Sequence, residues 1–92
     1  MNEIYKNKVV LVTGASRGIG KAIAYKFASQ GAYVLGTATT EESAKNISNN
    51  FRKKKFLGAG FVLNITKKSS IEQFEKNIKD LDAPNILINN AG

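Results

Sequence analysis

Cysteine and histidine are both absent from this chain of 92 residues, and acidic side chains are scarce. Without cysteine there is no disulfide, no thiolate nucleophile and no cysteine-based metal site. Without histidine the chain lacks the commonest general base and a common metal ligand. The seven acidic residues are scattered apart from the pair Glu41-Glu42, so a carboxylate metal cluster is not indicated. These absences exclude several classes of enzyme before any motif is considered.

Long apolar runs are also missing. No stretch approaches the roughly 20 residues that a membrane-spanning helix needs, and none follows a basic amino terminus as in a signal peptide. The proportions of hydrophobic residues, 42%, and of charged residues, 23%, are ordinary for a globular domain. We therefore expect residues 1–92 to belong to one soluble, cytoplasmic domain with no membrane partner.

Positive charge outweighs negative charge, since 14 lysine and arginine residues give a formal net charge of +7. Such a balance suggests a nucleic-acid partner. However, twelve of the fourteen are lysine, and only residues 52–55 form a run. Solvated lysine faces are therefore favoured. We expect no nucleic-acid partner, and a basic nucleic-acid-binding domain is the alternative.

Apolar runs alternate with helical patterns, which is typical of βαβ units and a parallel sheet. The patterns predict strands at residues 8–13, 32–38, 56–64 and 85–89, and helices at about 19–30, from 39 and from 69. Right-handed crossovers then give an α/β, Rossmann-like, doubly wound sheet of strand order 3-2-1-4. Ligands in such a sheet bind where the order reverses, beyond the carboxyl ends of the first and fourth strands.

Two capping boxes predict where the second and third helices begin. Thr39 and Glu42 have the spacing of one box, and Ser69 and Glu72 have that of the other. An apolar stripe then extends the third helix to Leu81.

The sequence TGASRGIG at residues 13–20 joins the first strand to the first helix. Glycine permits positive φ and leaves room for a phosphate against the backbone. We expect Gly14 to make the sharp exit from the strand, Gly18 to admit a pyrophosphate and Gly20 to let the helix pack closely. Free N–H groups at the start of the helix would then bind the anion. The alternative for this spacing is a tight turn without a ligand.

The end of the second strand bears on the choice of cofactor. Proteins that bind NAD usually place an acidic residue there, and an acid would repel a 2′-phosphate. This chain has Gly36, Thr37, Ala38 and Thr39 instead, and Arg17 lies inside the glycine turn, where a guanidinium can bind phosphate. NADP(H) is therefore favoured over NAD(H). The alternatives are a solvated loop charge for Arg17 and a plain helix N-cap for Thr39.

The end of the third strand, LNIT at residues 63–66, has properties that suit adenine. The side-chain amide of Asn64 can donate and accept hydrogen bonds as an adenine edge requires, and Ile65 offers an apolar face to the ring. A turn residue is the alternative for Asn64.

Together, TGASRGIG, LNIT and the NNAG segment at residues 89–92 resemble the short-chain dehydrogenase/reductase family. Within it, GTATT at residues 36–40 is similar to the bacterial members that reduce 3-oxoacyl groups on acyl carrier protein. The resemblance implies that Asn64 and Ile65 meet the adenine, that Thr39 lies near the 2′-phosphate and that Asn89 ties the fourth strand to its neighbours. It also implies a set of phosphate-binding residues, Gly14, Ala15, Ser16, Arg17, Gly18, Ile19 and Gly20, and a set that lines the adenosine ribose, Asn90, Ala91 and Gly92.

The same resemblance implies an activity, namely the NADPH-dependent reduction of 3-oxoacyl-acyl-carrier-protein to its 3-hydroxyacyl form in fatty-acid biosynthesis, by a homotetramer. Family members place an Asn, a Ser and a Tyr-x-x-x-Lys pair after the NNAG segment. No such positions follow within residues 1–92. We therefore expect this chain to supply only the dinucleotide-binding part and to be inactive by itself. A truncated, non-catalytic remnant with residual nucleotide binding is the alternative.

Overall fold

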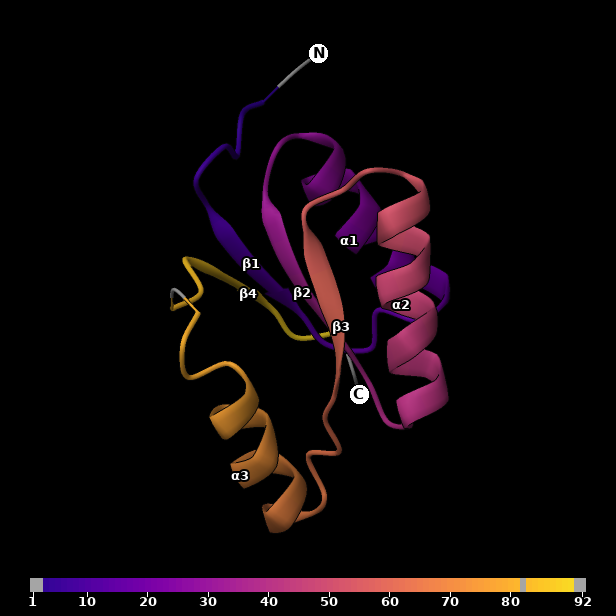
Figure 1. The fold of residues 1–92 in the computed structure, drawn as a ribbon, viewed down its shortest axis with the longest axis vertical. Coiled ribbons are helices and arrows are strands. Elements are labelled where there is room, and N and C mark those ends of the chain that lie inside the picture. The colour runs from indigo at the N-terminus through magenta and orange to yellow at the C-terminus, as the bar shows by residue number, and fades with distance from the viewer. Residues whose placement is uncertain (1–2, 82, 91–92) are drawn as a thin grey trace.

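The computed structural model describes residues 3–81 and 83–90, in which helices alternate with the strands of one parallel sheet. The elements are (Figure 1) β1 (Val9–Val12), α1 (Gly18–Ser29), β2 (Tyr33–Ala38), α2 (Glu41–Lys53), β3 (Gly58–Val62), α3 (Lys68–Asn77) and β4 (Ile86–Ile88). The strand order is β3-β2-β1-β4, as predicted. This order confirms the Rossmann-like α/β class and places the switch point between β1 and β4.

The central strand β1 aligns the carboxyl ends of its two neighbours. Val12 pairs with Gly36 of β2 on one side and with Ile88 of β4 on the other, and both pairings are parallel. The segments that leave these strands, including Thr39 and Asn90, therefore emerge at the same edge of the sheet.

A hydrophobic core fills the face of the sheet that α1 and α2 cover (Figure 1). Val10 and Val12 of β1 both belong to it, because side chains two residues apart on a strand point to the same face. They pack with Ala24 of α1 and with Phe51 of α2, whose side chain is only 1% exposed. This packing holds the start of α1 at a constant position beyond the end of β1.

The third helix meets the opposite face of the sheet. Gly60 of β3 faces α2, since a Cβ atom there would lie 2.7 Å from Cβ of Ile47. The next residue, Phe61, therefore points the other way, and its ring lies edge-on to Phe74 of α3 at a centroid distance of 6.0 Å. Within residues 3–81 and 83–90, no helix is long and apolar enough to cross a membrane.

Both predicted capping boxes are wrong. The chain bends after β2, and Thr40, whose own backbone is extended, is the N-cap of α2 and accepts a hydrogen bond from the Ser43 N–H at 3.2 Å. Thr39 consequently lies outside the helix. In α3 the N-cap is Lys67, which makes no side-chain cap, and Ser69 lies within the first turn.

Two predicted boundaries also change. α3 ends before Ile78, its C-cap, so the apolar stripe does not reach Leu81 in helical form. β3 is shorter than residues 56–64 because the Phe56 N–H donates to the Phe51 carbonyl oxygen at 2.9 Å, which ties Phe56 to the end of α2. Of the other strands, β1 and β4 are one residue shorter than predicted at both ends, and β2 is one residue shorter at its start.

Candidate functional site

The glycine turn between β1 and α1 requires glycine at all three positions. Gly14 and Gly18 have φ values of +64° and +62°, in the left-handed region where a side chain is strained. Gly20 is required by space, since a Cβ atom there would meet the Gly14 carbonyl group and lie 2.6 Å from Nδ2 of Asn90. The close packing predicted for Gly20 is thus confirmed, and it brings α1 against the segment that follows β4.

Thr37, at the end of β2, holds the first residues of this turn. Its hydroxyl oxygen accepts a hydrogen bond from the Gly14 N–H at 3.4 Å, and its carbonyl oxygen accepts one from the Ala15 N–H at 2.8 Å. Thr37 and Ala15 are both buried, with 2% and 3% of their surface exposed. Ala15 therefore supports the turn from behind, because its N–H is already used within the protein.

The first turn of α1 presents backbone donors that the protein does not use. Lys21 is the first helical residue whose N–H finds a carbonyl partner, that of Arg17 at 3.3 Å. In the part of the chain that the structure describes, the N–H groups of Gly18, Ile19 and Gly20 have no acceptor. Such groups, together with the helix dipole, bind phosphate.

A cleft of about 480 Å³ opens beside this turn, at the carboxyl edge of the sheet. Four segments far apart in the sequence line it, because their strands end at the same edge. The lining consists of Thr13, Gly14, Ser16, Arg17, Gly18, Thr37, Ala38, Thr39, Leu63, Asn64, Ile65, Thr66 and Asn90. The structure thus brings together the predicted site residues of the glycine turn, of the end of β2, of the segment after β3 and of the segment after β4.

Some predicted residues lie elsewhere. Ala15 and Gly20 are buried behind the turn, and the side chain of Ile19 is 72% exposed, away from the lining. Ala91 and Gly92 lie outside the described residues. The sequence analysis did not select the lining residues Leu63 and Thr66 individually, although both belong to the LNIT segment that it quoted. Their positions directly after a predicted strand were the available signal.

The electrostatic character of the cleft suits an anion. No carboxylate is among its described lining residues, and Arg17 contributes a positive charge. Because Thr40 caps α2, the alternative interpretation of Thr39 as the helix N-cap is wrong. The Thr39 hydroxyl has no hydrogen-bond partner within residues 3–81 and 83–90, so it is available to a ligand.

Asn64 has the turn role that was considered for it, and part of its side chain is left over. Its Oδ1 accepts hydrogen bonds from the N–H and the hydroxyl of Thr66, at 3.0 and 2.6 Å, which confirms that Asn64 is a turn residue. Its Nδ2 group has no acceptor in the described part of the chain and therefore remains a donor for a ligand. Ile65, which is 54% exposed, adds an apolar surface beside it.

Thr13 joins the end of β1 to the end of β4. Its hydroxyl oxygen lies 3.3 Å from Oδ1 of Asn89 and accepts a hydrogen bond from the Asn90 N–H at 2.9 Å. Nδ2 of Asn90 in turn donates to the Gly14 carbonyl oxygen at 3.3 Å. Asn89 thus ties β4 to its neighbour, as predicted, and Asn90 closes the cleft on this side.

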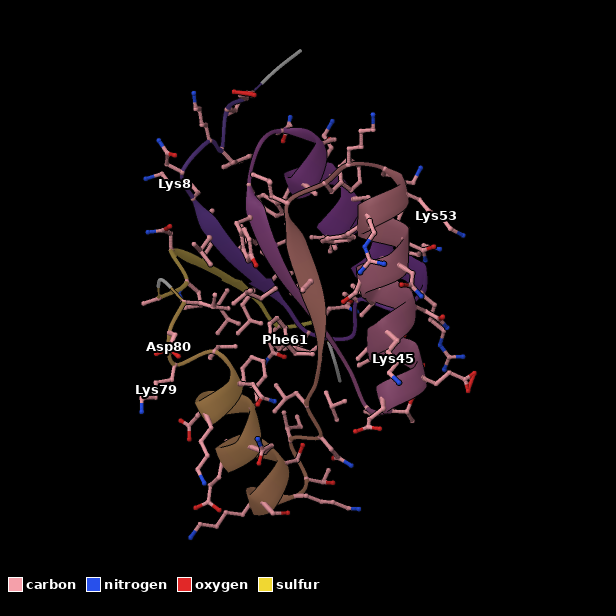
Figure 2. All side chains as sticks on the ribbon, in the orientation of Figure 1. Lys8, Lys45, Lys53, Phe61, Lys79 and Asp80 are labelled. Carbon is pink, nitrogen blue, oxygen red and sulfur yellow. The ribbon has the colours of Figure 1, made fainter. Side chains whose placement is uncertain are left out.

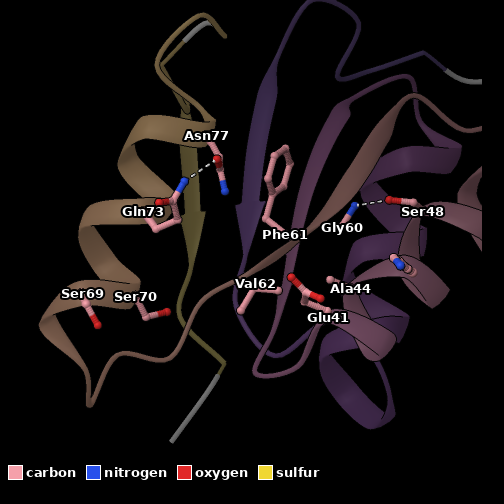
Figure 3. A pocket seen from close by; sticks show the side chains of 11 residues that line it. Glu41, Ala44, Ser48, Gly60, Phe61, Val62, Ser69, Ser70, Gln73 and Asn77 are labelled. Carbon is pink, nitrogen blue, oxygen red and sulfur yellow. Dashed lines mark hydrogen bonds between the residues drawn. The ribbon is translucent and has the colours of Figure 1, made fainter.

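A second hollow, of about 550 Å³, lies between α2 and α3 along β3 (Figure 3). None of the predicted site residues lines it. Its notable feature is a hydrogen bond from the Gly60 N–H to Oγ of Ser48, at 2.8 Å, which satisfies an outward-facing group of this edge strand. Capping an edge in this way protects a sheet from pairing with other strands.

Comparison with known proteins decides the family. Residues 8–92 match the family model described as short chain dehydrogenase. The chain belongs to this family. Three relatives of this short chain dehydrogenase, each a 3-oxoacyl-acyl-carrier-protein reductase FabG, come from Salmonella typhimurium, Haemophilus influenzae and Vibrio cholerae, with identities of 49%, 50% and 51%. The alignments cover 96%, 95% and 95% of this chain but only 35% of each relative. The chain therefore spans about a third of the length of these relatives.

Proposed function

We propose that this chain binds NADP(H) and forms the cofactor-binding part of a reductase that acts on 3-oxoacyl-acyl-carrier-protein. The observation that carries the proposal is the composition of the cleft at the switch point. It combines unused backbone donors, a guanidinium and a free hydroxyl, and its described lining contains no carboxylate. This donor set suits the phosphates of a dinucleotide, and family membership makes a dinucleotide the expected ligand.

The glycine turn would hold the pyrophosphate. Gly14 and Gly18 leave the backbone bare, and the free N–H groups of the exposed Gly18 and Ile19 supply donors at the positive end of α1. Ser16 lines the same wall of the cleft and adds a hydroxyl group. Ala15 contributes by positioning the turn against β2.

The 2′-phosphate would lie between Arg17 and Thr39. Both residues line the cleft, and Thr39 is free because its neighbour Thr40 caps α2. A guanidinium can bind phosphate oxygens through two parallel hydrogen bonds, whereas the ribose hydroxyl of NAD is usually bound by an acid at the end of the second strand. Residues 36–39 contain no acid, which favours NADP(H).

The adenosine would occupy the opposite wall. Nδ2 of Asn64 can donate to an adenine nitrogen, and Ile65 can pack on the ring. Asn90, with Ala91 and Gly92 after it, would line the ribose. The nicotinamide of a bound NADPH supplies a hydride to a carbonyl carbon, and the residues of this chain hold and orient the other end of the cofactor.

The substrate is proposed from the relatives, whose names specify 3-oxoacyl-acyl-carrier-protein reduction. Reduction of that carbonyl to a hydroxyl needs a proton donor as well as the hydride. The family pattern places its Ser, Tyr and Lys after the NNAG segment, so we propose that those groups belong to the remaining two-thirds of the relatives' length. A cytoplasmic homotetramer is part of the same proposal. The alternative is a nucleotide-binding remnant without catalytic activity.

Calorimetric titration with NADPH and NADH tests the cofactor proposal, on protein whose folding is verified by circular dichroism. We expect NADPH to bind at least tenfold more tightly than NADH. The substitution Thr39→Asp places a carboxylate at the end of β2 and should reverse this preference. Asn46→Asp, at an exposed position within α2, adds the same charge away from the cleft and should leave it unchanged. Failure of a folded sample to bind NADPH, or equal affinity for the two nucleotides, would contradict the proposal.

A further inference from the structure

Three segments of the chain meet at the end of the sheet that lies opposite the glycine turn (Figure 1). They are residues 3–8, the connection from α1 to β2 and the connection from α2 to β3. Hydrogen bonds join them to one another and to β2: Tyr5 N–H donates to the Gln30 carbonyl at 2.9 Å, and Val34 N–H donates to the Leu57 carbonyl at 3.2 Å. We call this end of the molecule the amino pole, because the strands begin there.

The amino pole gathers half of the cations of the chain. They come from all three segments and from the adjoining helix ends, and Figure 2 labels two of them, Lys8 and Lys53. All of them are exposed: Lys6, Lys8, Lys26, Arg52, Lys53, Lys54 and Lys55. Among residues 3–81 and 83–90, Glu3 and Asp80 are the acidic residues of the same region. None of these cations forms an ion pair with a residue that the structure describes. The fold thus brings cations that are distant in sequence onto one surface, on which positive charges outnumber the described negative ones.

Exposed aliphatic side chains lie among these cations. Ile4 is 61% exposed and Leu57 is 59% exposed. Leu57 also lines a hollow of about 380 Å³ with Lys8 and Leu81, and Leu81 is 37% exposed. Large aliphatic groups in water are unfavourable, and at this pole they are combined with unpaired positive charge.

The helix dipole explains only part of this arrangement. Lys26, Arg52 and Lys53 lie in the last turns of α1 and α2, where a positive charge stabilises a helix. Lys6 and Lys8 belong to no helix, however, and Lys55 follows the C-cap of α2 with a positive φ of 59°. The dipole also gives no reason for the exposed Ile4 and Leu57.

We infer that the amino pole binds the surface of a membrane that contains anionic phospholipids. Lysine ammonium groups would pair with lipid phosphates, while Ile4 and Leu57 would insert among the acyl chains near the headgroups. Such contact at a surface needs no spanning helix, so the absence of long apolar runs does not oppose it. The cofactor cleft lies at the opposite end of the sheet, and it would stay open to ligands when the pole is bound.

The side chains of the amino pole favour a lipid surface over a nucleic acid as the binding partner. Nucleic-acid surfaces favour arginine, which binds guanine and phosphate in pairs of hydrogen bonds, and aromatic rings on which bases stack. Here six of the seven cations are lysine. The nearby ring of Tyr5 packs edge-on against Phe27 at 4.9 Å and is only partly exposed. Aliphatic side chains beside lysine are instead typical of interfacial membrane contacts.

Vesicle co-sedimentation of the whole 92-residue chain tests the inference. The probes are vesicles of phosphatidylglycerol and phosphatidylcholine, compared with vesicles of phosphatidylcholine alone. The variant K53Q/K54Q/K55Q removes three charges at the pole. The control K45Q/K68Q/K76Q removes three exposed charges elsewhere and so has the same net charge. Each lysine near an anionic membrane surface raises the partition coefficient roughly fivefold. We therefore expect partitioning of the first variant onto the anionic vesicles to fall tenfold or more, and that of the control to fall less than twofold. Equal losses in the two variants would overturn the inference, since binding would then depend on net charge alone.

A second pair of variants tests insertion of the aliphatic groups. Leu57→Ser should weaken binding to the anionic vesicles several-fold, whereas Ile71→Ser, on α3 and 36% exposed, should not. Binding of a DNA duplex is measured in parallel. If the chain binds duplex as tightly as vesicles and Leu57→Ser changes neither, the pole is a nucleic-acid surface and the inference is wrong.

Discussion

Nδ2 of Asn90 donates a hydrogen bond to the carbonyl oxygen of Gly14 at 3.3 Å, in the space that a side chain on Gly20 would enter. The Asn90 side chain can rotate away from an added methyl group, but the Gly14 carbonyl is backbone and cannot. Gly20→Ala should therefore shift the glycine turn or the start of α1. We expect it to lower the free energy of unfolding by about 1–3 kcal/mol, a typical cost of overpacking, measured by urea denaturation.

Helix propensity alone would predict the opposite sign for that substitution, because alanine is the better helix former. Ala22→Gly, at an exposed position of the same helix, isolates the propensity effect and should cost about 1 kcal/mol or less. If Gly20→Ala stabilised the protein, the close approach of α1 to the turn would not constrain this position.

Thr37 should affect cofactor binding although only 2% of its surface is exposed. Thr37→Val keeps the shape of the side chain but leaves the Gly14 N–H without the hydroxyl oxygen that accepts it. We expect a loss of stability of about 1 kcal/mol and a several-fold weaker affinity for NADPH, measured by calorimetry. Thr37→Ser restores the acceptor and should restore most of the affinity. Equal affinities for all three proteins would show that this hydrogen bond does not position the turn.

Arg17 should distinguish the two nucleotides. Arg17→Gln removes a charged partner of the 2′-phosphate, and hydrogen bonds to charged groups contribute roughly 1.5–3 kcal/mol. We expect NADPH to bind about tenfold or more weakly and NADH to bind almost unchanged, in fluorescence titrations of both nucleotides. Arg52→Gln, which removes the other arginine of the chain at the opposite end of the sheet, is the control. A similar loss for both nucleotides would assign Arg17 to the pyrophosphate instead.

Thr39 and Thr40 should have separate effects despite being neighbours. Thr40→Ala removes the N-cap of α2 and should lower the free energy of unfolding by about 1 kcal/mol. Thr39→Ala should change stability by less than about 0.5 kcal/mol, as is usual at the surface, while weakening NADPH binding. Thermal unfolding and NADPH titration of both variants check this division. If Thr39→Ala lowered the stability more than Thr40→Ala does, Thr39 would be the residue that caps α2.

Most of the fold was predictable because local patterns and global topology agree. The β-branched run before Gly14 and the alternation of strands with helices were sufficient for the strand order. The capping boxes failed because Thr39 and Thr40 are both competent caps, and the exit geometry of β2 decides between them. That geometry depends on packing, which a sequence motif does not contain.

The site was predictable where a residue type is tied to a backbone constraint. Gly20 is an example, since its spacing in the turn indicated the close approach that the structure shows. The role of Thr37 was harder to predict, because its hydrogen bond to Gly14 joins two segments that only the register of the sheet brings together. The amino pole could not be predicted from the run at residues 52–55, because Lys6 and Lys8 join it only through the fold.

The long sequence separation between Gly14 and Asn90 has a consequence for biosynthesis. The ribosome makes the phosphate-binding turn early, but the amide that closes it comes 76 positions later, after β2 and β3 have been translated. A nascent chain must therefore assemble all four strands before the nucleotide has a finished pocket to enter. The cofactor can then bind only late in folding and stabilise the sheet that is already assembled. The earlier folding steps must be favourable in the absence of cofactor.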